Sequence, residues 1–100
     1  KIVYDADKLD SLGAVGVGRA FLFAGRVHAR LHNTEREAVN SPAYSREDTA
    51  YREYLVKLRH LPDGMLTEPG RTIARERAAF MAEFFRRMNA ETGLDANMPS

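Results

Sequence analysis

Cysteine is absent from the 100 residues of this chain. Its absence excludes disulfide bonds and metal sites built on thiolates, and nothing in the composition indicates an oxidising compartment. The chain also lacks an apolar run of the roughly 20 residues that a membrane-spanning helix needs. Its first residues lack the charged-then-apolar pattern of a secretion signal. We therefore expect a cytoplasmic protein with no membrane partner.

An excess of one charge is also missing. The chain has 15 Lys and Arg residues against 14 Asp and Glu residues, a formal net charge of +1. Non-specific binding of nucleic acid depends on many contacts between cationic side chains and phosphates. In a chain with balanced charge, nearby carboxylates offset most of these cations. Nucleic acid is therefore a weak candidate partner.

The chain is short and starts abruptly. Its length suits one small domain with a modest core. It begins Lys1-Ile2-Val3-Tyr4, without an initiator Met, and an acidic motif follows at once. We therefore expect it to be part of a longer protein.

The spacing of apolar residues predicts an all-α structure with three principal helices. The first is expected near Asp5 to Phe23, the second near Arg46 to Leu61 and the third near Glu68 to Thr92. The stretch from Gly25 to Ser45 has no clean period and is interpreted as a loop that can include one short helical turn. Residues 94–100 form a tail that is expected to be frayed.

Capping residues support these boundaries. Ser45 can cap the second helix, and the Pro62-Asp63-Gly64 run is expected to end it. Thr67 can cap the third helix, Pro69 falls in its first turn, and Gly93 can stop it. The Met and Phe residues of the third helix are interpreted as core packing: Phe80, Met81, Phe84, Phe85 and Met88.

Three glycines lie close together in the first predicted helix. Gly13, Gly16 and Gly18 weaken a helix relative to alanine, and their order fits neither a dinucleotide fingerprint nor a P-loop. We expect that a neighbouring segment packs closely against them.

Acidic residues open the same helix. Asp7 and Asp10 are three residues apart, so they lie on one face of a helix and can bind a cation together. Acidic residues at a helix start also complement the helix macrodipole, which is the structural alternative for this pair.

The sequence around these carboxylates resembles that of a known family. The run from Asp5 to Phe21, DADKLDSLGAVGVGRAF, is similar to the final motif of a bacterial subfamily of HD-domain hydrolases. Residues 66–71 and 74–81 are similar to the last helix of that subfamily. The resemblance covers most of the chain and is weakest in the Gly25 to Ser45 loop, and it implies that residues 1–93 are the C-terminal helical part of an HD-type domain.

The resemblance implies a metal-dependent phosphohydrolase. In the HD family a His, a His-Asp pair and a last Asp hold a divalent cation, which activates water against a phosphoester. Asp7 matches the last Asp and is therefore the implied metal ligand and catalytic residue. Lys8 is the implied contact for the substrate phosphate, although a solvated surface lysine is an equal alternative. The implied substrate of the complete protein is a phosphorylated small molecule, with nucleotides among the candidates.

The chain departs from the family pattern in its histidines. His28, His32 and His60 all come after the acidic motif, and the residue directly after each of them is not Asp. The other metal ligands are therefore missing, so we expect no tightly held divalent cation and no activity from this segment alone. If the interpretation is right, the complete reading frame encodes a His and a later His-Asp pair before Asp5.

Two further pairings can be considered from the sequence. His28 and His32 are four residues apart, but Ala29 stands where a zinc-protease motif needs Glu, so a zinc site is a minor alternative. Arg77 falls on the apolar stripe of the third helix, where an unpaired charge is costly to bury. We expect it to pair with a carboxylate, and Asp10 is one candidate.

A second function belongs to another class. The chain can be a small helical module that binds itself or a protein partner through the apolar faces of its helices, without catalysis. Helices that normally cover a missing N-terminal half would leave apolar residues such as Leu9, Leu12 and Phe21 without a partner, so we expect the segment to self-associate as a homo-oligomer.

Overall fold

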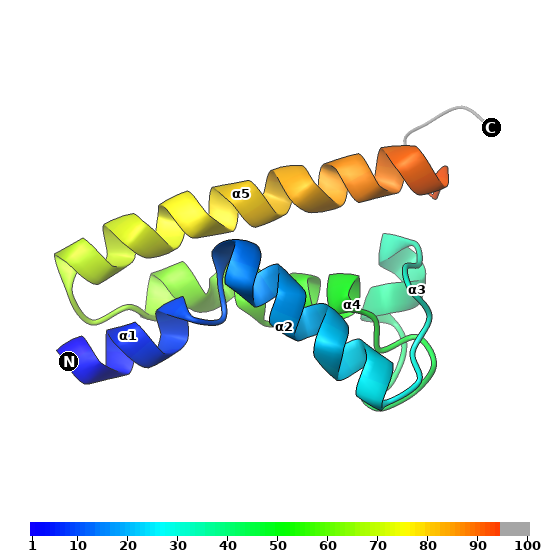
Figure 1. Cartoon of the computed structure of the whole chain (residues 1–100), viewed down its shortest axis with the longest axis horizontal. Coiled ribbons are helices and arrows are strands. Elements are labelled where there is room, and N and C mark those ends of the chain that lie inside the picture. Colours follow the sequence, from blue (N-terminus) through cyan, green and yellow to red (C-terminus); the bar gives the residue numbers. More distant parts are fainter. Residues whose placement is uncertain (95–100) are drawn as a thin grey trace.

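The computed structural model describes residues 1–94, which form helices and connecting loops with no strand among them. The all-α prediction is therefore confirmed. The long last helix lies along one side of the molecule, and the shorter helices form a second layer against it (Figure 1). The elements in chain order are α1 (Ile2–Leu9), α2 (Gly13–Arg26), α3 (Glu35–Val39), α4 (Ala50–Val56), the 3-10 helix η1 (Leu58–Gly64) and α5 (Glu68–Thr92).

The predicted bounds of α5 are confirmed at both ends. The Thr67 hydroxyl caps the helix by accepting from the backbone N–H of Gly70 at 3.1 Å, and Pro69 lies in the first turn. Gly93 ends the helix in the left-handed conformation, with φ of 70°. This helix was predictable because its signals are local.

The first predicted helix is wrong, because the chain breaks it into α1 and α2. Leu12 is extended, with φ of −122° and ψ of 166°, and its side chain is buried with 1% exposed. Gly13 follows at φ of 72°, a conformation that suits glycine. A Cβ on Gly16 would overlap the Ser11 carbonyl, since α2 folds back closely on the break, whereas Gly18 has open space around it. Close packing of a neighbouring backbone is thus confirmed for Gly16, whereas the neighbour of Gly13 is the Arg77 side chain and the expectation is wrong for Gly18.

The second predicted helix is also wrong in its extent. Thr49, not Ser45, caps α4, because its hydroxyl accepts from the backbone N–H of Arg52 at 3.0 Å. The Ser45 hydroxyl instead donates to the Pro42 carbonyl at 2.7 Å in the preceding loop. After α4 the chain continues as η1, which contains Pro62 and ends at Gly64, the last residue of the run that was expected to end the helix. The loop between Gly25 and Ser45 holds the short α3, as the interpretation allowed.

Aromatic rings from α2, α4 and α5 meet around Phe85, whose side chain is only 2% exposed. Its ring centroid lies 5.0 Å from that of Tyr54, 5.3 Å from that of Tyr51 and 6.4 Å from that of Phe21. Phe80 of the same helix is 48% exposed, so its assignment to the core was wrong. The core therefore holds α5 against the second layer through one face only.

The expectation that Leu9, Leu12 and Phe21 lack a partner within the segment is also corrected. Leu12 is buried, while Leu9 and Phe21 are partly buried against the core. The exposed apolar side chains of α2 are instead Val15 and Leu22. The described residues thus pack against the side chains that were expected to lack partners, and other apolar side chains of α2 are exposed instead.

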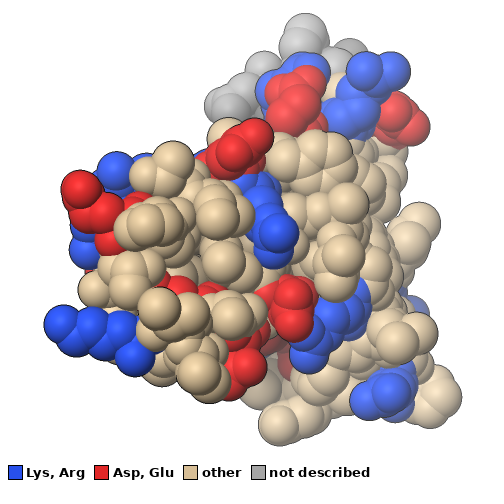
Figure 2. All heavy atoms as spheres, turned by 60° about the vertical axis from the view of Figure 1, so that its left-hand side comes forward, with Lys and Arg blue, Asp and Glu red and all other residues tan. Residues whose placement is uncertain are grey.

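Charges of both signs are interspersed over the face in Figure 2, with uncharged residues between them. This view agrees with the balanced composition of the chain. Within the described range, no helix is both long and apolar enough to cross a bilayer.

Candidate functional site

The acidic stretch of α1 contains one buried carboxylate, that of Asp5. Asp5 is 3% exposed. Its Oδ1 accepts from the Leu66 N–H at 2.8 Å, and its Oδ2 accepts from the Thr67 N–H at 2.9 Å and from the Thr67 hydroxyl at 2.5 Å. Donation from Leu66, followed by that from the Thr67 hydroxyl, lowers the pKa of Asp5 below its ordinary 3.8. Asp5 therefore joins α1 to the start of α5 as an ionised group.

Gly70 makes room for this carboxylate. A Cβ on Gly70 would overlap Asp5 Oδ2 and crowd the Thr67 hydroxyl. The Thr67 hydroxyl thus donates to Asp5 while it accepts from the Gly70 N–H. The cap of α5 and the position of α1 depend on the same three residues.

Asp7 and Lys8, the two predicted site residues, lie on the same helix but are not engaged in this way. Asp7 is exposed, and no hydrogen bond or ion pair joins its carboxylate to another group in residues 1–94. Lys8 is half-buried, and its Nζ lies 5.4 Å from the centroid of the Tyr4 ring, within the range of a cation–π contact. The structure therefore leaves the Asp7 carboxylate open to a ligand from outside the described segment.

The carboxyl end of α1 attracts two arginines. Arg19 Nη1 donates to the Asp10 carbonyl at 3.2 Å, and Arg77 Nη1 donates to the Leu9 carbonyl at 2.8 Å. The last carbonyls of a helix lack helical partners and carry partial negative charge, which favours cations there. The expected pairing of Arg77 with the Asp10 carboxylate is wrong, since the backbone of α1 is its partner.

The described residues alone do not make a metal site. Within residues 1–94 no group of three or more His, Cys, Asp or Glu side chains could hold a metal ion. Asp7 fits the role of one ligand, and several are needed to fix a cation. His28 and His32 lie in a loop, so their spacing does not place them on one helix face as the zinc alternative required.

His32 has a structural position in the core. Its Nε2 lies 2.6 Å from Asn89 Oδ1, which assigns the Nε2 hydrogen to the neutral ring, and the ring stacks on Phe85 with centroids 6.3 Å apart. Burial lowers the pKa of His32 below 6.5, the Asn89 contact opposes this shift, and the charge of Arg30 adds to it. His32 Nδ1 is buried without a partner among the described residues. The neutral imidazole therefore ties the loop after α2 to α5.

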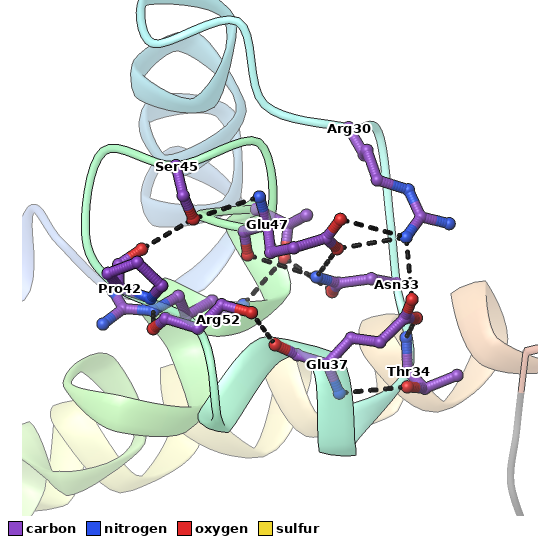
Figure 3. A network of polar contacts seen from close by, with 10 residues as sticks. Arg30, Asn33, Thr34, Glu37, Pro42, Ser45, Glu47 and Arg52 are labelled. Carbon is purple, nitrogen blue, oxygen red and sulfur yellow. Dashed lines mark hydrogen bonds and ion pairs between the residues drawn. The ribbon is translucent and has the colours of Figure 1, made fainter.

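A polar network anchors the same loop to the start of α4 (Figure 3). Asn33 is fully buried; its side-chain amide donates to the Glu47 backbone carbonyl at 3.1 Å and to Glu47 Oε1 at 2.9 Å, and its Oδ1 accepts from the Thr49 hydroxyl at 2.8 Å. Arg30 Nη1 bridges Glu37 and Glu47 at 3.0 Å each. Because every member has partners in the network, we interpret it as a lock on the loop and not as a catalytic cluster. Sequence analysis did not identify this network.

No family model matches the chain, and comparison with known proteins finds a relative whose structure has been solved. The protein YpgQ of Bacillus subtilis (strain 168), described as uncharacterized, is 41% identical over 97 residues, which are 96% of this chain and 42% of YpgQ. A crystal structure of YpgQ matches with a TM-score of 0.73, and one of YpgQ in complex with ADP matches with a TM-score of 0.71. Both are 36% identical and cover 90% of this chain and 42% of YpgQ. The chain thus spans less than half the length of this relative.

Proposed function

We propose that this chain is the C-terminal part of a metal-dependent phosphohydrolase of the HD type, and that Asp7 supplies one carboxylate ligand to a divalent cation. The observation that carries this proposal is the difference between two carboxylates of α1. The Asp5 carboxylate accepts hydrogen bonds from Leu66 and Thr67. The Asp7 carboxylate, two residues further along, is exposed and has no partner among the described residues. A carboxylate held on an anchored helix but left without a partner is suited to ligate a cation.

The substrate class rests on two further supports. The motif from Asp5 to Phe21 resembles that of HD-domain hydrolases, and the relative YpgQ was crystallised in complex with ADP. A bound divalent cation supplies an acidified water and neutralises phosphate charge. Lys8 stands next to Asp7, and its ammonium would meet a phosphate oxygen by leaving the Tyr4 ring. We infer that the substrate is a phosphorylated small molecule, with a nucleotide as the leading candidate.

The test is an activity screen of the full-length gene product that contains this chain. We expect hydrolysis of a nucleotide or phosphomonoester that requires Mn²⁺ or Mg²⁺, stops with EDTA and returns when metal is added. We also expect the reading frame to encode a His and a later His-Asp pair before Asp5. Absence of those ligands, or no metal-dependent hydrolysis of any phosphoester, would contradict the proposal.

A self-association module is the second candidate, because α2 exposes apolar side chains. Val15 and Leu22 are seven residues apart on its open face, with Gly18 between them and open space at its Cα. Such a stripe of large and small residues can receive another helix. Sedimentation of the chain should then show a dimer that Leu22→Glu dissociates. A monomer at all concentrations would exclude this candidate.

A further inference from the structure

Away from the Asp7 carboxylate, a groove of about 350 Å³ runs between α2 and α4. Gly16, Arg19, Ala20 and Phe23 line its α2 wall, and their spacing of three and four residues places them on one helix face. The opposite wall is α4 with the loop before it. The volume lies within the range of small-molecule sites.

One end of the groove is aromatic and its backbone is strained. The rings of Phe23 and Tyr44 meet edge to face, with centroids 6.0 Å apart, and the Tyr44 side chain is 74% exposed. Tyr44 has φ of 63°, a left-handed conformation that is costly for a bulky side chain. Its backbone N–H donates to Asp48 Oδ2 at 2.7 Å, and Asp48 is buried. The fold therefore holds an exposed ring at the mouth of the groove instead of burying it, and such strain often marks a contact with a ligand.

The charged side chains that line the groove have a positive net charge. Arg52 forms an ion pair with Asp48 at 3.2 Å, so these two charges offset each other. Lys57 Nζ lies 3.8 Å from Glu53 Oε1, and because the Lys57 side chain is exposed, water screens this long ion pair. Arg19 has no ion pair within residues 1–94, and one of its five N–H groups donates to a backbone carbonyl. Guanidinium and ammonium groups are therefore available to an anion.

We propose that this groove binds a small aromatic anion, with its planar ring against Tyr44 and Phe23 and a phosphate group at Arg19 and Lys57. Arg19 and Phe23 are about one helical turn apart, a separation that a nucleoside monophosphate spans between its base and its phosphate. The ring contributes stacking on an aromatic side chain, and the phosphate contributes charge-assisted hydrogen bonds. The site lies on α2 and α4, so it does not depend on the hydrolysis proposed for Asp7.

The test is an NMR titration of the ¹⁵N-labelled chain with AMP in the presence of EDTA, which removes metal binding as a variable. We expect the largest shifts at the amides of Gly16, Arg19, Tyr44 and Lys57. Adenosine and inorganic phosphate, which each supply half of the interaction, should bind at least about tenfold more weakly than AMP.

Variants then separate the two ends of the groove. Arg19→Ala and Tyr44→Asn should each weaken AMP binding about tenfold; Asn tolerates the left-handed backbone, so the second variant should keep its fold. Arg36→Ala, on the exposed side of α3, is the matched control and should leave the affinity unchanged. AMP shifts confined to α1 would overturn the groove while leaving the role of Asp7 intact. An unchanged affinity in Arg19→Ala and Tyr44→Asn would also overturn it.

Discussion

Replacement of Phe85 by Ala tests whether this chain has a core of its own. The ring is 2% exposed, and four aromatic rings have centroids within 6.3 Å of its own, those of His32, Tyr51, Tyr54 and Phe84. Removing a buried phenyl group loses its transfer free energy and leaves a cavity, at a cost of about 3–5 kcal/mol. A domain of this size has a free energy of unfolding of about 5–15 kcal/mol. Phe85→Ala should therefore remove a large part of the stability.

The assays are urea unfolding and thermal unfolding of the isolated chain, both followed by circular dichroism. Phe80→Ala is the matched control, because Phe80 lies on the same helix but is 48% exposed, and we expect a change within about 0.5 kcal/mol. The melting temperature of Phe85→Ala should fall by more than about 10 °C. If Phe85→Ala costs no more than Phe80→Ala, the aromatic cluster does not stabilise the chain and the described packing is refuted.

Three further predictions follow from single contacts. Asp5→Asn should lower the urea midpoint because it removes an ionised hydrogen-bond acceptor, whereas Asp7→Asn should leave the midpoint unchanged; equal effects would contradict the division between them. Burial holds the pKa of His32 below 6.5, so the unfolded chain takes up the proton first and stability should fall as pH drops below 6.5; His32→Gln should flatten this part of the profile. Gly70→Ala should destabilise the chain because the new Cβ would overlap the Asp5 carboxylate. Gly18→Ala should stabilise the chain by about 0.5–1 kcal/mol, because a Cβ at Gly18 meets no neighbouring atom. The reverse order of stabilities in unfolding experiments would contradict the described surroundings of these glycines.

Local signals account for what the sequence could predict. The ends of α5 are set by Thr67, Pro69 and Gly93, and each acts on its own turn of the helix. The short α3 had a comparable signal, since Thr34 and Glu37 form a capping box at its start. That spacing could have identified the helix within the predicted loop.

Tertiary contacts account for what the sequence could not predict. The break between α1 and α2 depends on the burial of Leu12 and on the positive φ of Gly13, and neither is visible in a helical period. Asp5 looked like one of several acidic residues because its partners, Leu66 and Thr67, lie more than 60 residues away in the chain. The sequence pattern identified the acidic helix, but only the fold separates its structural carboxylate from the open one.

The most direct test of the proposed function measures Mn²⁺ binding and turnover in the full-length gene product and in its Asp7→Asn variant. Asn keeps the size of the side chain but lacks the charge that a metal ligand contributes, and loss of a ligand weakens both the bound metal and the acidity of its water. We predict that calorimetry shows markedly weaker metal binding, that hydrolysis falls by at least about a hundredfold, and that the unfolding midpoint does not change. Unchanged metal affinity and unchanged turnover in Asp7→Asn would contradict the assignment of Asp7 as a metal ligand.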